Sequence, residues 1–127
     1  MKDGITFDTG ALIALERRGL RARRIVERAT EEKIRITVPS PVVTEWWRGR
    51  TDAREEILAS ATISASLPVM QAAGVALRDL RAVDAGCTID AIVMATAALF
   101  GGIVITSDPS DLAALARHFP SVTVLST

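Results

Sequence analysis

The sequence predicts a single α/β domain built on a mainly parallel central sheet of about five strands, with helices flanking the sheet. Short strand-like runs alternate along the chain with longer stretches of helical spacing, and this alternation is typical of parallel sheets. The length of 127 residues leaves room for one domain. Hydrophobic residues make up 49% and charged residues 24%, as in ordinary globular proteins. We therefore expect residues 1–127 to fold as one unit.

Five short runs have the residue pattern of β-strands. Residues 34–38 alternate between apolar and polar types with a period of two, whereas residues 103–106 are almost wholly apolar, as buried parallel strands are. The expected strands are residues 5–7, 34–38, a weak one around Ile63, 103–106 and 122–125. In parallel sheets of this kind the ligand crevice lies beyond the carboxyl ends of the strands.

Helix signals fall between these strands. Ser40-Pro41 supplies an N-cap followed by proline at the first helical position. Asp52 with Glu55 three residues later resembles a capping pair, and Thr88 is expected to cap a long apolar helix. Asp108-Pro109 is expected to open a last helix. The strands are thus separated by helices throughout, as the parallel sheet requires.

The net charge is zero, but the charges are unevenly distributed along the chain. Ten of the 15 basic residues fall between Arg17 and Arg50, whereas the stretch from Asp84 onward has four aspartates against Arg117 alone. This asymmetry suits a protein that presents basic groups to phosphates and gathers its acids elsewhere. The basic segment can equally well be one solvated helix, and the sequence leaves both interpretations open.

Cysteine usage and hydropathy indicate a cytoplasmic protein without a membrane span. The single Cys87 can form no internal disulfide, which agrees with a reducing compartment. No basic stretch followed by an apolar core begins the sequence, so a signal peptide is not expected. No apolar run approaches the ~20 residues that cross a bilayer.

Four acidic residues are expected at one edge of the sheet. Asp8 directly follows the first strand, and Asp108 comes two residues after the fourth strand. Glu45 lies one turn into the helix after the second strand, and Asp90 lies in the first turn of the helix expected from Thr88. Each of them also has an ordinary explanation as a turn, capping, helix-dipole or solvated residue. Their common location at the carboxyl edge favours a shared role.

Four carboxylates at one place repel one another by several kcal/mol unless cations compensate. Mg²⁺ takes carboxylate oxygens and keeps several waters, which suits a few acids with gaps between them, and Mn²⁺ can substitute. A softer metal would need histidine or cysteine, but His118 and Cys87 are single and far apart in sequence. The pattern therefore predicts a magnesium site.

Three stretches of the sequence resemble PIN domains. ITFDTGALIAL at residues 5–15 looks like their opening motif, and TIDAIVMATA at residues 88–97 resembles the helix of their third acid. IVITSDPSDL at residues 103–112 is similar to their closing strand and acidic loop, in the form common among VapC toxins. Glu45, which follows Val38-Pro39-Ser40, matches their second acidic position. The resemblance covers essentially the whole chain, in the family's order.

The resemblance implies a Mg²⁺-dependent endoribonuclease that is the toxin of a toxin–antitoxin pair and forms a homodimer. Asp8 and Asp90 would be the firmest metal ligands, with Glu45 and Asp108 completing the site partly through water. Three residues would have secondary roles near the site: Asp111, Thr9 and Thr106. The implied partners are an RNA substrate and a cognate small antitoxin that blocks the acidic pocket with a basic side chain.

The expected chemistry is hydrolysis by metal-activated water, with a carboxylate accepting the proton. One ion or two is left open. A small-molecule phosphatase with an aspartyl nucleophile is the alternative enzyme, although Asp8 lacks a second Asp two residues on. A phosphate-accepting signalling module would need a late lysine, and the only lysines are Lys2 and Lys33. A PIN-like RNA-binding or interaction module without a toxin role also remains open. For Trp46 and Trp47 we favour one in the core and one at an interface over base stacking.

Overall fold

The computed structural model describes residues 4–48, 53–81 and 86–127, and its centre is a five-stranded sheet. The strands are β1 (Gly4–Phe7), β2 (Ile36–Pro39), β3 (Thr62–Ser64), β4 (Gly102–Thr106) and β5 (Thr123–Ser126). They lie in the order β3-β2-β1-β4-β5, and every pair of neighbours is parallel. The prediction of a mainly parallel sheet of about five strands is thus confirmed.

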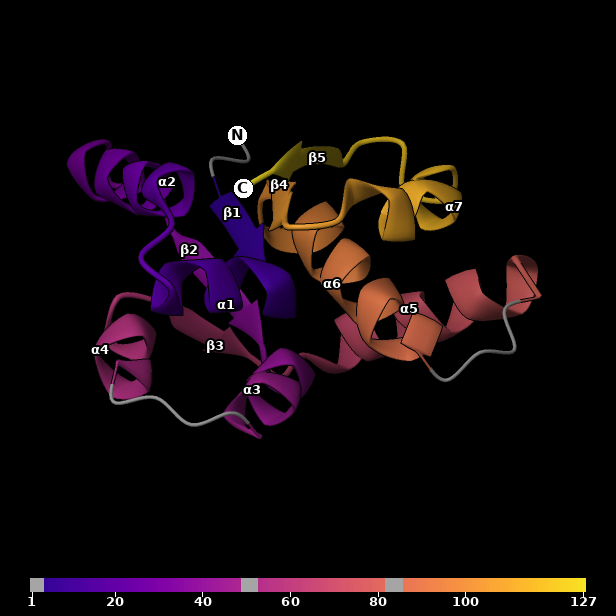
Figure 1. Cartoon of the computed structure of the whole chain (residues 1–127). Helices are drawn as coiled ribbons and strands as arrows, with labels where there is room; N and C mark the ends of the chain where they lie inside the picture. Colours follow the sequence, from indigo (N-terminus) through magenta and orange to yellow (C-terminus); the bar gives the residue numbers. More distant parts are fainter. Residues whose placement is uncertain (1–3, 49–52, 82–85) are drawn as a thin grey trace.

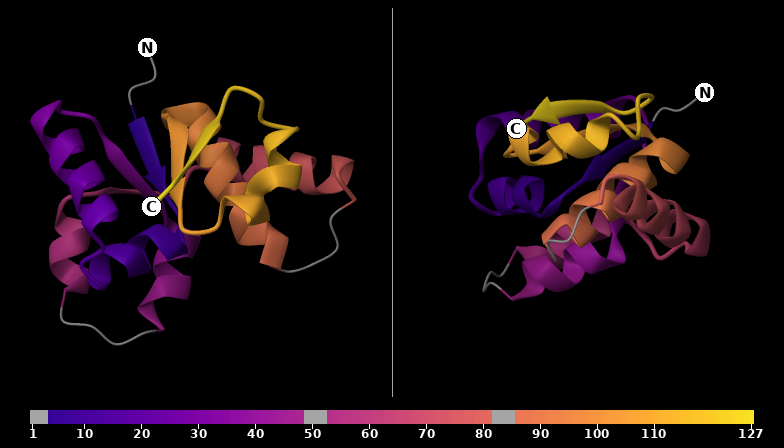
Figure 2. Two further views of the ribbon diagram at one scale, coloured as in Figure 1. Left: turned by 45° about the horizontal axis from the view of Figure 1, so that its top comes forward. Right: turned by 90° about the vertical axis from the view of Figure 1, so that its right-hand side faces the viewer.

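Helices cover both faces of the sheet (Figure 1). The α-helices are α1 (Thr9–Glu16), α2 (Leu20–Glu31), α3 (Ser40–Trp47), α4 (Arg54–Ala59), α5 (Leu67–Asp79), α6 (Gly86–Phe100) and α7 (Ala113–Ala116), and η1 (Pro109–Leu112) is a 3₁₀ turn. Helix α6 packs on β1, β2 and β4, and α5 packs on its outer side. Helix α1 lies on the other face, in contact with α2, α3 and α4. Figure 2 shows α1 and α5 on opposite sides of the sheet.

The core is densest between α6 and the two central strands. Residues 91–97 of α6 are all buried, so this stretch is enclosed around its full circumference, and all of it except Thr96 is apolar. Phe7 on β1, Leu12 on α1 and Ile105 on β4 are among the largest fully buried side chains. The ends of β1, β4 and α6 are therefore fixed by the best-packed part of the molecule.

The strand register brings the carboxyl ends of β1 and β4 level with each other. Phe7 is paired with Ile105, and the N–H of Asp8 donates to the carbonyl of Ile105 at 3.3 Å. The residues that follow β1 and β4 consequently emerge side by side. This is the sheet edge at which the acidic residues were expected.

Several helix starts differ from the sequence expectation. Helix α6 begins at Gly86, so Thr88 lies inside it and Asp90 lies beyond its first turn. Packing of the apolar helix on the sheet outweighs the modest helix cost of threonine, because propensity is a weak determinant. Pro39, with extended backbone angles, is the N-cap of α3, and Ser40 is its first residue.

The two other predicted helix starts are those at Asp52 and at Asp108. Asp52 lies outside the described residues, and α4 has Ala53 as its N-cap. Asp108-Pro109 opens the 3₁₀ turn η1 rather than an α-helix, and only the four residues of α7 follow as α-helix. In the part of the chain that the structure describes, no helix is both long enough and apolar enough to cross a membrane.

Candidate active site

A pocket of about 500 Å³ opens at the carboxyl edge of the sheet, beyond the ends of β1 and β4. Five carboxylates line it, from α3, α6, the β1–α1 junction and the segment after β4: Asp8, Glu45, Asp90, Asp108 and Asp111. No lysine, arginine or histidine is among the described residues that line it. We call this cavity the acid pocket. It gathers the four acids predicted from the sequence, together with Asp111.

Asp8 is held rigidly at the start of α1. Its carboxylate accepts a hydrogen bond from the N–H of Ala11 at 2.8 Å, so it is the N-cap of the helix. Burial raises the pKa of Asp8, and the charge of Glu45 raises it further, while hydrogen bonds from Thr106 and from the backbone of Ala11 oppose the rise. The net shift is upward. Asp8 therefore has a structural role in addition to any chemical one.

Asp90 lines the pocket from α6, and more carboxylates raise its pKa than raise that of Asp8. Burial, followed by the negative charges of Asp111, Asp8, Glu45 and Asp108, raises the pKa of Asp90 to about 6. The side chain is only partly exposed, so water does not screen these charges fully. A cation in the pocket would favour the ionised carboxylate instead.

The side chain of Glu45 is oriented by the hydroxyl of Thr9, which lines the same pocket from α1. The side chain of Thr9 donates a hydrogen bond to Oε1 of Glu45. This bond joins the first turn of α1 to α3 across 36 residues of sequence. Thr9 is one of the three secondary residues named from the sequence, and it lies in the pocket as a neighbour of Glu45.

Asp108 and Asp111 are the exposed acids of the pocket, on and beside η1. Asp108 is the N-cap of η1, yet its side chain makes no capping hydrogen bond. Its Oδ1 instead accepts from the hydroxyl of Ser110 at 2.5 Å, and its N–H donates to Oγ1 of Thr106 at 3.1 Å. Capping therefore does not explain why an acid occupies position 108.

Four lining residues of the acid pocket were not predicted from the sequence: Gly10, Cys87, Ile89 and Ser107. Cys87 lines the pocket from α6. It precedes Asp90 by three residues, and that spacing on a helix would have placed both on one face. Gly10 also lines the pocket, and a Cβ at this position would lie 2.1 Å from Oγ of Ser107. Glycine here allows α1 to pack closely against the loop after β4.

The chemistry of the donors suits a hard divalent cation, since the pocket offers several carboxylates and the hydroxyls of Thr9, Thr106 and Ser107. The spacing sets a limit, however. Among the described residues no three His, Cys, Asp or Glu side chains are grouped closely enough to hold one ion together. An ion in this pocket would therefore be ligated directly by few carboxylates and by the others through water, a mode that Mg²⁺ favours.

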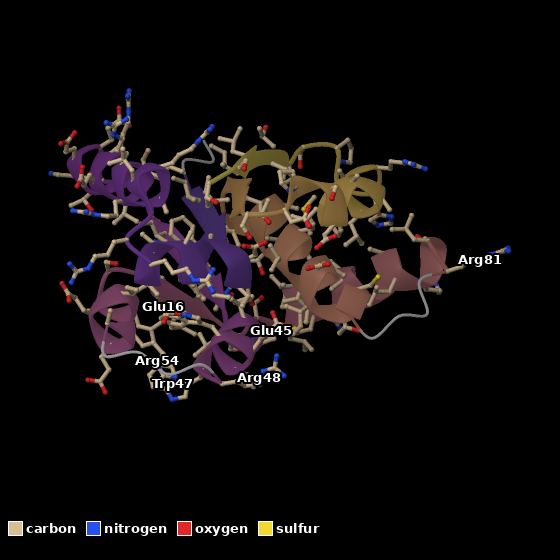
Figure 3. The ribbon with its side chains drawn as sticks, viewed as in Figure 1. Glu16, Glu45, Trp47, Arg48, Arg54 and Arg81 are labelled. Atoms are coloured by element: carbon tan, nitrogen blue, oxygen red, sulfur yellow. The ribbon has the colours of Figure 1, made fainter. Side chains whose placement is uncertain are left out.

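The two tryptophans have different environments. Trp46 is 2% exposed, and its indole N–H donates to Oε1 of Glu16. Trp47 is 43% exposed, and the guanidinium of Arg54 lies 4.3 Å from the centre of its ring (Figure 3). The prediction that one of them belongs to the core is confirmed. The role of Trp47 remains a prediction.

Comparison with known proteins agrees with the fold. The sequence matches the PIN domain family over residues 5–117. The chain is similar in structure to a chain in the crystal structure of VapBC2 from Rickettsia felis. In that structure VapBC2 is bound to a DNA fragment from its promoter. The TM-score is 0.71 and the identity 12%, covering 97% of this chain and 98% of that one. No curated protein sequence matches the chain. The chain therefore belongs to the PIN domain family, whose members are generally nucleases that use divalent metal ions.

Proposed function

We propose that this chain is a Mg²⁺-dependent endoribonuclease and the toxin of a toxin–antitoxin pair. The observation that carries the proposal is the acid pocket, in which five carboxylates meet without a neutralising base among the described lining residues. The raised pKa values of Asp8 and Asp90 express the cost of this arrangement. Clusters of this kind are retained where a cation is bound or protons are transferred.

Each side chain of the acid pocket has a role in this proposal. Asp8 and Asp90 would hold the ion directly, and Glu45 and Asp108 would hold it through water. The ion, when bound, lowers the pKa of a water molecule and offsets charge on the phosphodiester. Asp8 keeps its position because the Ala11 N–H fixes its carboxylate.

The remaining residues act on these ligands. The hydroxyl of Thr9 orients Glu45, which leaves the second carboxylate oxygen of Glu45 available to accept a proton from water. Thr106 supports both Asp8 and the backbone of Asp108. Asp111 adds negative charge beside Asp90 and has a secondary role.

The test of the enzymatic proposal is cleavage of a labelled RNA with Mg²⁺, with Mn²⁺ and with EDTA. Wild type should cleave only with metal, and Asp8→Asn and Asp90→Asn should lose cleavage by at least about a hundredfold while remaining folded. Glu27→Gln, which removes an exposed carboxylate on α2, is the matched control and should cleave as wild type does. Full activity of folded Asp8→Asn protein would refute the site.

The proposed partner is a small antitoxin that places an arginine in the acid pocket. Arginine suits bidentate contact with carboxylates better than lysine does. Expression from the native operon should co-purify the partner, and expression of the chain alone should arrest growth. Growth unaffected by the wild-type chain would refute the toxin role and leave the nuclease proposal standing. We also propose a homodimer that acts in the cytoplasm, where its RNA substrate is found.

One observation favours a second candidate, an RNA-binding or interaction module without catalysis. The described side chains of the pocket do not form a ready three-ligand metal cluster. A module of this kind would bind single-stranded RNA but leave it intact with Mg²⁺ and Mn²⁺. Stable binding without cleavage, in protein that is fully folded, would decide for this candidate.

A further inference from the structure

A second cavity, of about 480 Å³, adjoins the acid pocket along α3. We call it the side groove, and it is lined by Ser40, Pro41, Thr44, Glu45, Arg48 and Ile89. Glu45 and Ile89 line both cavities. The two cavities therefore adjoin each other at these two residues, so an extended ligand can occupy both at once.

The lining residues of the side groove follow one stripe of α3. Positions 40, 44 and 48 are four residues apart, and they lie on one face of the helix. Figure 3 shows Arg48 beside Glu45 at the end of this helix. The groove thus has polar side chains along one face of α3 and apolar lining from Pro41 and Ile89. Glu45 lies where the groove adjoins the acid pocket, and Arg48 lies at the C-terminal end of α3.

Arg48 has spare hydrogen-bonding capacity. Its Nε donates to the backbone carbonyl of Glu45 at 3.3 Å, which steadies the base of the guanidinium group. The guanidinium has five donors, and the described residues give its terminal nitrogens no carboxylate partner. The side chain is exposed. A planar guanidinium held in this way suits a phosphate from solvent.

The charges of the two cavities are complementary for a polyanion that passes through both. The acid pocket is lined by carboxylates, and a bound cation offsets charge only near itself. A neighbouring phosphate of the same strand needs a further positive group. Arg48 is the only basic residue among the described residues that line either cavity.

We propose that the side groove holds the RNA strand next to the cleaved bond, and that Arg48 binds the adjacent phosphate as a positioning residue. This inference rests on the proposed nuclease function. Ser40 and Thr44 line the same groove, and their hydroxyls would contact the sugar–phosphate backbone. Because Arg48 contacts a phosphate that does not react, it contributes to binding and not to the chemical step.

The test compares three variants with wild type, using a fluorescein-labelled single-stranded oligoribonucleotide. Arg48→Gln removes the charge and Arg48→Lys keeps it. Arg81→Gln removes an exposed arginine just beyond the C-terminal end of α5, distant from Glu45 (Figure 3). Affinity is measured by anisotropy with Ca²⁺ in place of Mg²⁺, at 50 to 200 mM salt. Cleavage with Mg²⁺ gives kcat and KM, and thermal melts show that each variant is folded.

The loss of one phosphate contact sets the expected size of the effect. Arg48→Gln should weaken binding about fivefold at 0.1 M salt and reduce the salt slope by roughly 0.7 to 1. KM should rise by a similar factor at unchanged kcat. Arg48→Lys should keep the wild-type salt slope, and Arg81→Gln should match wild type in every measurement.

The outcomes separate this inference from the function on which it rests. Normal cleavage by wild type, with Arg48→Gln and Arg81→Gln equal in affinity and salt slope, would overturn the role of Arg48 alone. A fall in kcat at saturating RNA, with KM unchanged, would also overturn it, as would a reduced salt slope in Arg48→Lys. Failure of wild-type protein to bind or cleave RNA would overturn the proposed function, and the assignment of Arg48 with it.

Discussion

The acid pocket and helix α2 are two strongly charged regions of the molecule, and they differ in how their charges are arranged. On α2, arginines and glutamates are mixed along an exposed surface, and only Ala22 and Ala29 are buried. Arg28 and Glu32 form an ion pair at 3.3 Å, and their side chains are 77% and 49% exposed. In the acid pocket all charges have one sign, and Asp8, Glu45 and Asp90 are partly buried.

The difference shows that the density of charged residues along a sequence does not indicate how each charge changes the free energy of unfolding. Exposed pairs such as Arg28 and Glu32 contribute about 0–1 kcal/mol, because water and salt screen them. Several carboxylates in one partly buried pocket repel one another and destabilise the fold, unless they bind a cation or one of them is protonated. We therefore expect substitutions in the acid pocket to have large, metal-linked effects, and substitutions on α2 to have small ones.

The largest expected effect is stabilisation of the wild-type protein by metal. A ligand that binds only the folded state adds about 2.7 kcal/mol at a hundredfold excess over its Kd, which is roughly 10 °C in Tm for a domain of this size. Asp90→Asn should gain much less, and Glu27→Gln on α2 should gain as much as wild type. Thermal melts with EDTA and then with Mn²⁺ measure these shifts. Wild-type Tm unmoved by millimolar Mn²⁺, with a lower Tm for Asp90→Asn, would mean that the acids are structural.

A smaller effect is expected from pH in the metal-free protein. The pKa of Asp90 in the folded state, about 6, lies above its usual value of 3.8, so the folded state binds the proton more tightly. The stability that this group contributes is fully present below about pH 4 and is lost as the pH rises through 6. The upward shift of the Asp8 pKa acts in the same direction.

The difference between wild type and Asp90→Asn isolates this contribution, because asparagine resembles the protonated acid. In EDTA, Asp90→Asn should be the more stable protein at pH 7.5, by on the order of 1–2 kcal/mol after allowance for solvent screening. Its advantage should fall to about a third of that value near pH 4.5 and vanish only below the unfolded-state pKa of 3.8. Urea denaturation at both pH values measures it, and an advantage independent of pH would show that repulsion at Asp90 is not the cause.

The fold and the acidic residues of the acid pocket could be predicted, because both follow from local patterns. Strand runs and acids at strand ends are readable in sequence, and the rule for the carboxyl edge of parallel sheets places the acids together. The start of α6 could not be read, because its packing on the sheet overrides the capping preference of Thr88. The position of Arg48 beside the acids could not be predicted either. Ten basic residues cluster in the sequence, and only the fold shows that Arg48 is the one that adjoins the acid pocket.

A still smaller effect is expected from the capping role of Asp8. Asp8→Asn keeps a side-chain oxygen for the Ala11 N–H, whereas Asp8→Ala removes it. The alanine variant should therefore be about 1 kcal/mol less stable than the asparagine variant, with or without metal. The same pair of substitutions at Asp108 should differ by less, because that side chain makes no capping bond. Urea denaturation of the four variants measures both differences, and equal differences at the two positions would contradict the assigned cap.

The smallest effect is expected on α2, where Arg21→Gln and Arg24→Gln together remove two charges. Both arginines are exposed, so the double variant should change the free energy of unfolding by no more than about 0.5 kcal/mol. Figure 1 shows α2 on the far side of α1 from α6, which carries Asp90. Neither arginine lines the acid pocket or the side groove. RNA affinity should therefore fall less than it does in Arg48→Gln, despite the doubled charge change. Anisotropy at 150 mM salt compares the two. A larger loss in the double variant would mean that the basic cluster of the sequence, rather than the arginine beside the acids, binds the phosphates.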